Sequence, residues 1–225
     1  MTMGKKRLYT AKSPLRRAKG AVVGIVAHLI AVAIFAGMVG MNLSYLLAAD
    51  GETPLREGFD LPAFAPYALA YGLAAMLQIA SLAAYGVLFL MWVHRTNRNA
   101  HSLAGGMDTS PGWAVGWFFV PLVSLWKPFH ALDQTWRVST EPSRWRALDT
   151  PFILRLWWGF YLASNVTGWA SDVLRQERTV KGHLAAGMVA IVSAGLIIGA
   201  GVLLIRIIRT LTARQVSSLD AAAFN

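Results

Sequence analysis

Long runs of apolar residues, free of charged side chains, dominate this chain of 225 residues. The first run extends from Ala21 to Ala49 and the second from Leu61 to Val93, and neither contains Lys, Arg, Asp or Glu. A helix that crosses a bilayer needs about 20 such residues. We therefore predict membrane-spanning helices over residues 21–47 and 67–93, the second beginning near Pro66.

Two further apolar stretches predict helices over residues 151–173 and 183–206. Arg155 lies one turn into the first of these, beside Trp157 and Trp158. Its long side chain can reach the lipid headgroups while the indoles lie in the interface. The predicted fold is thus an all-α, polytopic transmembrane bundle of four spans in one domain of residues 21–209. A basic segment of residues 1–20 precedes it, and a polar tail of residues 210–225 follows.

Composition agrees with a membrane protein. Hydrophobic residues make up 56% of the chain and charged residues only 14%, whereas a soluble domain has about 25% charged residues. There is no cysteine, which excludes disulfides and thiolate metal sites. The formal net charge of +10 would suggest nucleic acid for a soluble protein. Here most of the excess lies beside the apolar runs, where it serves topology and the attraction of anionic lipids, so no nucleic-acid partner is expected.

The distribution of lysine and arginine predicts the orientation, because these residues are enriched in cytoplasmic segments. The first interhelical loop carries four acidic residues against Arg56 alone, which marks it as external. Both termini are accordingly expected in the cytoplasm. Anionic lipids are the expected partners of the basic residues that precede the first span: Lys5, Lys6, Arg7, Lys12, Arg16, Arg17 and Lys19.

The stretch of residues 111–139 is apolar and rich in tryptophan, yet it contains Pro121 and Pro128. Ser110 and Pro111 are typical of a helix start, and the helix that they predict ends near Phe119. From Pro121 to Ser139 the spacing predicts an amphipathic helix interrupted at Pro128. This segment either dips into the bilayer and returns or lies flat in the cytoplasmic interface.

The two sides of that predicted amphipathic helix differ in chemistry. One side is apolar and the other polar, so the polar side is expected to face water. The apolar side carries Leu122, Leu125, Trp126, Phe129, Leu132 and Trp136, and the polar side carries Ser124, Lys127, His130, Gln134 and Arg137.

Several motifs in this region recur in a fixed order: Trp92-Val-His-Arg-Thr-Asn-Arg-Asn99, Ser110-Pro-Gly-Trp-Ala-Val-Gly-Trp-Phe-Phe-Val-Pro121, Leu125-Trp-Lys-Pro128, Trp136-Arg137 and Leu156-Trp-Trp158. With them the chain resembles, from about Ala68 to Ile205, the bacterial family described as domain of unknown function 4328. That family usually has Asn where Ser124 stands and Arg where Lys127 stands. The resemblance implies a four-helix protein of the bacterial cytoplasmic membrane without an established activity.

The central segment is therefore the candidate site. We expect a non-enzymatic protein that binds a lipid, a small amphiphile or a protein partner there, alone or as a homo-oligomer, without a cofactor. His94, His101 and His130 lack the spacing of a metal site, and a Ser124–Lys127 dyad is a weaker, catalytic reading. The alternative function is a small transporter or channel that uses the broken helix, opposed by an expected lack of acidic side chains in the spans. The candidate binding residues are Arg95, Asn99, Trp113, Trp117, Trp126, Lys127, His130, Trp136 and Arg137.

Overall fold

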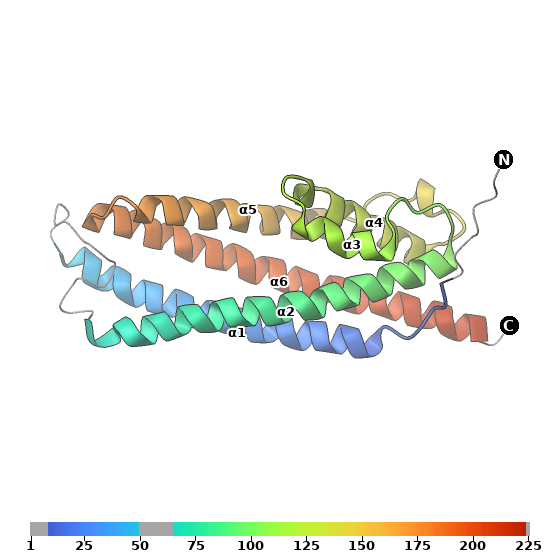
Figure 1. Ribbon diagram of the computed structural model, residues 1–225, viewed down its shortest axis with the longest axis horizontal. Coiled ribbons are helices and arrows are strands. Elements are labelled where there is room, and N and C mark those ends of the chain that lie inside the picture. The colour runs from blue at the N-terminus through green and yellow to red at the C-terminus, as the bar shows by residue number, and fades with distance from the viewer. Residues whose placement is uncertain (1–8, 50–64, 224–225) are drawn as a thin grey trace. The chain divides into compact units, whose positions relative to one another are not determined.

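The computed structural model describes residues 9–49 and 65–223, and the elements in these ranges are all helices (Figure 1). Four of them are long: α1 (Leu15–Leu47), α2 (Ala68–Leu103), α5 (Phe152–Arg175) and α6 (Val180–Ala223). The turn η1 (Ala65–Tyr67) precedes α2. Between α2 and α5 lie α3 (Pro111–Gly116), η2 (Trp117–Phe119), η3 (Val123–Leu125), α4 (Lys127–Thr140) and η4 (Trp145–Ala147). The all-helical prediction is confirmed.

Three of the long helices are long and apolar enough to cross a membrane: Leu15–Leu47, Ala68–Leu103 and Val180–Ser218. Their most apolar windows are only 33%, 11% and 22% buried within the protein, so most of their surface faces outward. Apolar side chains that remain exposed over whole helices are stable in lipid and not in water. The protein is therefore a multi-pass membrane protein. The remaining predicted span, over residues 151–173, coincides with α5. Its 24 residues extend over about 36 Å, but they are less apolar than those of the other three long helices.

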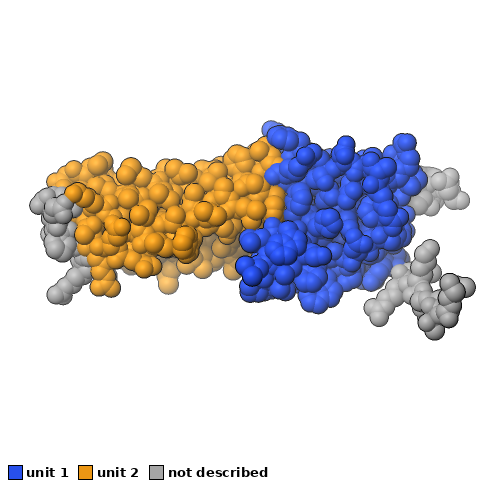
Figure 2. Space-filling view, turned by 90° about the horizontal axis from the view of Figure 1, so that it is seen from above, with its two compact units in different colours: residues 1–24, 86–155, 204–225 blue, residues 25–85, 156–203 orange. Residues whose placement is uncertain are grey.

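Contacts divide the chain into two compact units, which Figure 2 shows in different colours. Unit 1 comprises residues 1–24, 86–155 and 204–225, and unit 2 comprises residues 25–85 and 156–203. Unit 2 contains the later part of α1, the first half of α2, nearly all of α5 and the first half of α6. Unit 1 contains the central segment of residues 111–139 together with the ends of α1, α2 and α6.

Helix packing in unit 2 depends on glycines of α6. A Cβ atom added at Gly187 would lie 2.6 Å from Leu43, and one at Gly199 would lie 2.7 Å from the Phe160 ring. Small residues let membrane helices approach closely, so these positions accept only hydrogen. Among the polar residues of this unit, His28 Nδ1 lies 3.0 Å from Ser81 Oγ. This bond between α1 and α2 is the ordinary structural use of a histidine in a membrane helix.

The end of α6 differs from the prediction of a polar tail over residues 210–225. The helix continues to Ala223, and Thr212 and Gln215 are buried. The Trp92 indole donates to Thr212 Oγ1 at 3.1 Å, so α2 and α6 are joined here within unit 1. Leu211 is fully buried beside these polar residues, so the extension is held by apolar and polar contacts together.

Candidate functional site

The central segment begins as predicted. Ser110 takes the extended N-cap conformation and Pro111 occupies the first turn of α3. η2 follows directly and ends at Phe119, after which Val120 is extended before Pro121. The amphipathic helix, in contrast, starts at Lys127 and not at Pro121. Pro128 therefore lies in the first turn of α4, where its missing N–H costs nothing, and the predicted interruption at this residue is wrong.

Residues between the two helices form a turn with a conformation that is unusual for their chemistry. Leu122 has φ 61°, a region that residues with a Cβ atom rarely adopt, and its side chain is 74% exposed. Neither packing nor backbone propensity explains an apolar residue there. Such local strain is concentrated at functional sites.

Around this turn, large apolar side chains point out of unit 1 and form what we call the aromatic surface. Its members are between 50% and 74% exposed: Trp113, Phe119, Leu122, Leu125 and Trp126. Trp113 stacks on Trp117 with ring centroids 4.4 Å apart. Lys127 Nζ lies 5.9 Å from the centroid of the Trp117 ring, a cation–π geometry. His130 is also exposed.

The predicted polar side of α4 is exposed at His130 but turns into the protein further along the helix. All residues from Ala131 to Trp136 are buried, and Gln134 is only 2% exposed. Gln134 Nε2 donates to Asp108 Oδ2 at 2.7 Å, and its Oε1 accepts from the Asp108 backbone N–H at 3.2 Å. The expectation that the whole polar side faces water is therefore wrong for Gln134 and Arg137, because these two side chains find partners inside unit 1.

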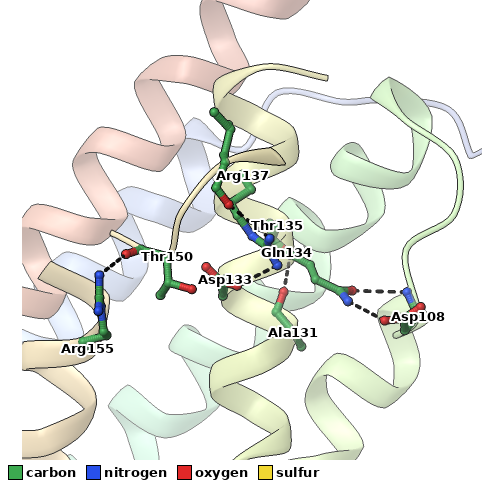
Figure 3. A network of polar contacts seen from close by, with 9 residues as sticks. Asp108, Ala131, Asp133, Gln134, Thr135, Arg137, Thr150 and Arg155 are labelled. Carbon is green, nitrogen blue, oxygen red and sulfur yellow. Dashed lines mark hydrogen bonds and ion pairs between the residues drawn. The ribbon is translucent and has the colours of Figure 1, made fainter. Parts of the chain in front are cut away.

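An ion pair within α4 is the second buried feature. Asp133 Oδ2 lies 2.8 Å from Arg137 Nη2, and the two side chains are only 3% and 15% exposed. Asp133 Oδ1 and Arg137 Nε are buried without a hydrogen-bond partner. Figure 3 shows Asp133 and Gln134 on opposite sides of α4, with Asp133 toward the segment that carries Thr150 and Arg155. Arg137 also donates to the Leu148 carbonyl at 3.2 Å.

A third group of hydrogen bonds joins distant parts of unit 1. Asn99 Nδ2 donates to Gln215 Oε1 at 3.0 Å and to the Lys12 carbonyl at 2.9 Å. Gln215 Nε2 donates to the Thr96 carbonyl at 2.8 Å and to Ser139 Oγ at 2.9 Å. The amides of Asn99 and Gln215 therefore join α2, α4, α6 and the segment before α1 to one another.

The predicted site residues consequently separate into three groups. Five belong to the exposed part of the central segment: Trp113, Trp117, Trp126, Lys127 and His130. Three lie inside unit 1 and support it: Asn99, Trp136 and Arg137. Trp136 is covered by Arg214, whose guanidinium carbon lies 4.4 Å from the ring centroid. Arg95 lies apart from both groups, on the face of α2 that meets α1, and its Nη1 has no partner.

The sequence analysis missed Asp133 and Gln215. The spacing of Asp133 and Arg137 is i, i+4, a local signal that predicts a helical ion pair. Gln215 gives no such signal, since its partners lie 76 to 119 residues away in the chain. In the described part of the chain, no group of three or more His, Asp or Glu side chains is arranged to hold a metal ion. His101 Nε2 instead lies 2.8 Å from the Thr109 carbonyl.

Comparison with known proteins gives one result. Neither a curated protein nor a solved structure matches the chain. A family model described as Domain of unknown function (DUF4328) matches residues 64–213, about two thirds of the chain, including the central segment and most of both units. The chain therefore belongs to the DUF4328 family, as its tryptophan- and proline-containing motifs predicted.

Proposed function

We propose that this protein crosses the bacterial cytoplasmic membrane four times and binds lipid, or an amphiphile of similar shape, through the aromatic surface of its central segment. The observation that carries the proposal is Leu122, an exposed apolar side chain held at φ 61°. Indole rings and long cationic side chains are characteristic of the headgroup layer. Trp113, Trp126 and Lys127 supply both kinds of group beside this residue.

Lipid contact predicts a specific quenching pattern. Native protein in nanodiscs made with lipids brominated near the headgroup should lose part of its tryptophan fluorescence. The variant Trp126→Phe should show a smaller quenched intensity, whereas Trp92→Phe should leave the quenched intensity unchanged and lower only the unquenched remainder, because Trp92 is fully buried. If acrylamide in water quenches the Trp126 component and brominated lipid does not, the aromatic surface faces water and the proposal fails.

The fourth crossing has its own test. With four crossings the two ends of the chain lie on the same side, and with three they lie on opposite sides. The chain has no cysteine, so a single introduced thiol reports its own location. Ser13, Gln176 and Ser217 are exposed positions for it. We expect a membrane-impermeant maleimide added to spheroplasts to label Gln176→Cys alone. Labelling of Ser217→Cys, with neither Ser13→Cys nor Gln176→Cys labelled, would show that α5 does not cross.

A second candidate function is transport of a small polar solute, and it is favoured by a cavity in unit 2. The cavity has a volume of about 300 Å³ and is lined in part by Gln78, Ser171, Asp172, Arg175 and Ser193. The three helices that are apolar enough to span a membrane carry no Asp or Glu, and the acidic residue of this cavity, Asp172, lies near the end of α5. However, the cavity lining includes no residue of the described central segment, so the broken helix does not form it.

Transport is tested with liposomes that contain the purified chain. Flux of a labelled solute down its gradient, abolished by Asp172→Asn and retained by the exposed-site variant Asp149→Asn, would establish this function. Equal leakage from native and Asp172→Asn liposomes would exclude a transport role for the cavity. A homo-oligomer would enlarge such a path, so the molecular mass in detergent should be measured on the same sample.

A further inference from the structure

Cationic side chains gather where the first turn of α1 approaches the last turns of α2, within unit 1. Arg17 Nη1 donates to the Met91 carbonyl at 2.9 Å. The charges of Arg17, Arg95 and Arg98 all act on His94, which places the four groups in one neighbourhood. We call Arg17, His94, Arg95 and Arg98 the arginine cluster.

No carboxylate compensates this cluster among the residues that the structure describes. The ion pairs Asp133–Arg137 and Glu141–Arg144 include no member of the cluster. Arg95 Nη1 and Arg98 Nε are buried and have no hydrogen-bond partner. Like charges held together at low dielectric repel one another, and buried donors without acceptors cost free energy. An anion bound between them would relieve both costs.

The face of α2 that carries the arginines continues as an apolar one. Leu88, Met91, Arg95 and Arg98 follow each other at intervals of three and four residues, so they form one stripe along the helix. A cavity of about 380 Å³ lies along it, lined by Arg16, Arg17, Gly20, Leu88 and Met91. The arginines at its rim suit the phosphate of a lipid, and the apolar residues of its floor suit the carbon chains below that phosphate.

The start of α1 supports the same conclusion. Its first turn contains no acidic residue, although the N-terminal end of a helix carries a positive partial charge that favours anions. Instead it carries Arg16 and Arg17, which the helix dipole disfavours. Guanidinium groups at such an end are suited to bind phosphate, whose oxygens accept two N–H groups from one arginine.

We propose that the arginine cluster binds one phosphate group, and that the cavity beneath holds the apolar part of the molecule to which the phosphate belongs. The site lies on a different face of α2 from the residues that contact the central segment, since Phe89 meets Phe118 there. It is thus separate from the aromatic surface. A glycerophospholipid and a soluble organic phosphate share the chemistry that it recognises, and the two are distinguished by experiment.

The experiment titrates the purified full-length chain, in a nonionic detergent, with fluorescent phosphatidylglycerol. We expect Arg95→Gln together with Arg98→Gln to weaken binding about 100-fold, the loss of two charge-assisted hydrogen bonds. The matched control removes two exposed arginines of the same unit, Arg206→Gln with Arg209→Gln, and should bind as the native chain does. Trp126→Ser should also leave binding unchanged, which separates this site from the aromatic surface.

A second variant tests the cavity and protects against misfolding of the arginine variant. A Cβ atom at Gly20 would meet Leu88 at 3.6 Å, so the backbone accepts a side chain that then enters the cavity. Gly20→Leu should weaken the binding of phosphatidylglycerol. Inorganic phosphate should still compete with the probe for the arginine cluster of this variant. If glycerol phosphate displaces the probe fully and Gly20→Leu has no effect, the ligand is a soluble phosphate. Equal affinity of the native chain and both double arginine variants, or equal affinity for an uncharged diacylglycerol, would overturn the proposal.

Discussion

The ion pair between Asp133 and Arg137 allows the sharpest test of how unit 1 is stabilised. Replacing Asp133 by Leu leaves the Arg137 guanidinium, 15% exposed, without its carboxylate. Removal of one partner from a buried pair costs about 3–5 kcal/mol, because the remaining charge keeps its desolvation cost. We therefore expect Asp133→Leu to lower the free energy of unfolding by about 3 kcal/mol or more.

The double variant separates this mechanism from loss of packing. Asp133→Leu with Arg137→Met removes both charges and keeps the side-chain volume, so it should recover most of the lost stability, as replaced buried pairs often do. Thermal unfolding in detergent, followed by near-ultraviolet circular dichroism, measures the stability of the native chain, of Asp133→Leu, of Arg137→Met and of the double variant. A double variant that loses as much as the two single variants together would refute the reasoning, since it would show that the two charges act independently.

Three further predictions concern packing, the amide network and an exposed pair. Gly199→Ala should lower the free energy of unfolding by about 1–3 kcal/mol, since the added methyl overlaps the Phe160 ring of α5. The control Gly195→Ala, with open space around it, should be neutral or stabilising. Thermal melts of the two variants test this difference. Gln215→Leu should cost about 1–3 kcal/mol, because it removes the hydrogen bonds that the buried Gln215 amide makes with Asn99, the Thr96 carbonyl and Ser139. Denaturant titration measures it, and an unchanged midpoint would contradict it. The hydrogen bond from Arg144 holds the pKa of Glu141 below its usual value. Any stabilisation from this pair is therefore present above the ordinary glutamate pKa and lost as pH falls through the lowered one; as the pair is exposed, Glu141→Gln should leave melting unchanged at neutral pH.

The helices of unit 2 could be predicted from the sequence because the bilayer imposes a simple rule on them. Uncharged apolar runs must form helices to satisfy their backbone groups in lipid. The predicted starts at 67, 151 and 183 accordingly lie within three residues of those of α2, α5 and α6. The helices α2 and α6 continue beyond the predicted spans of residues 67–93 and 183–206, because buried polar residues such as Asn99 and Gln215 pack there beside apolar ones and interrupt the hydropathy pattern.

The central segment could be predicted only in its first half. Pro111 fixes the start of α3 locally, and a local signal is readable. Where α4 begins depends instead on the turn at Leu122, whose positive φ no residue preference predicts. The burial of Gln134 depends on Asp108, 26 residues earlier in the chain. Long-range polar partners of this kind have no periodicity, so the candidate site was identified as a region but not residue by residue.

The bond between Asn99 and Gln215 also constrains the order of biosynthesis. The two residues are 116 positions apart, and a ribosome adds about 5–20 residues per second, so Asn99 is made about 6–23 seconds before its partner. During that interval the nascent chain must keep the amide hydrated or protected by the translocation machinery. Closure of unit 1 therefore waits until the ribosome has added the C-terminal half of α6, which carries Gln215.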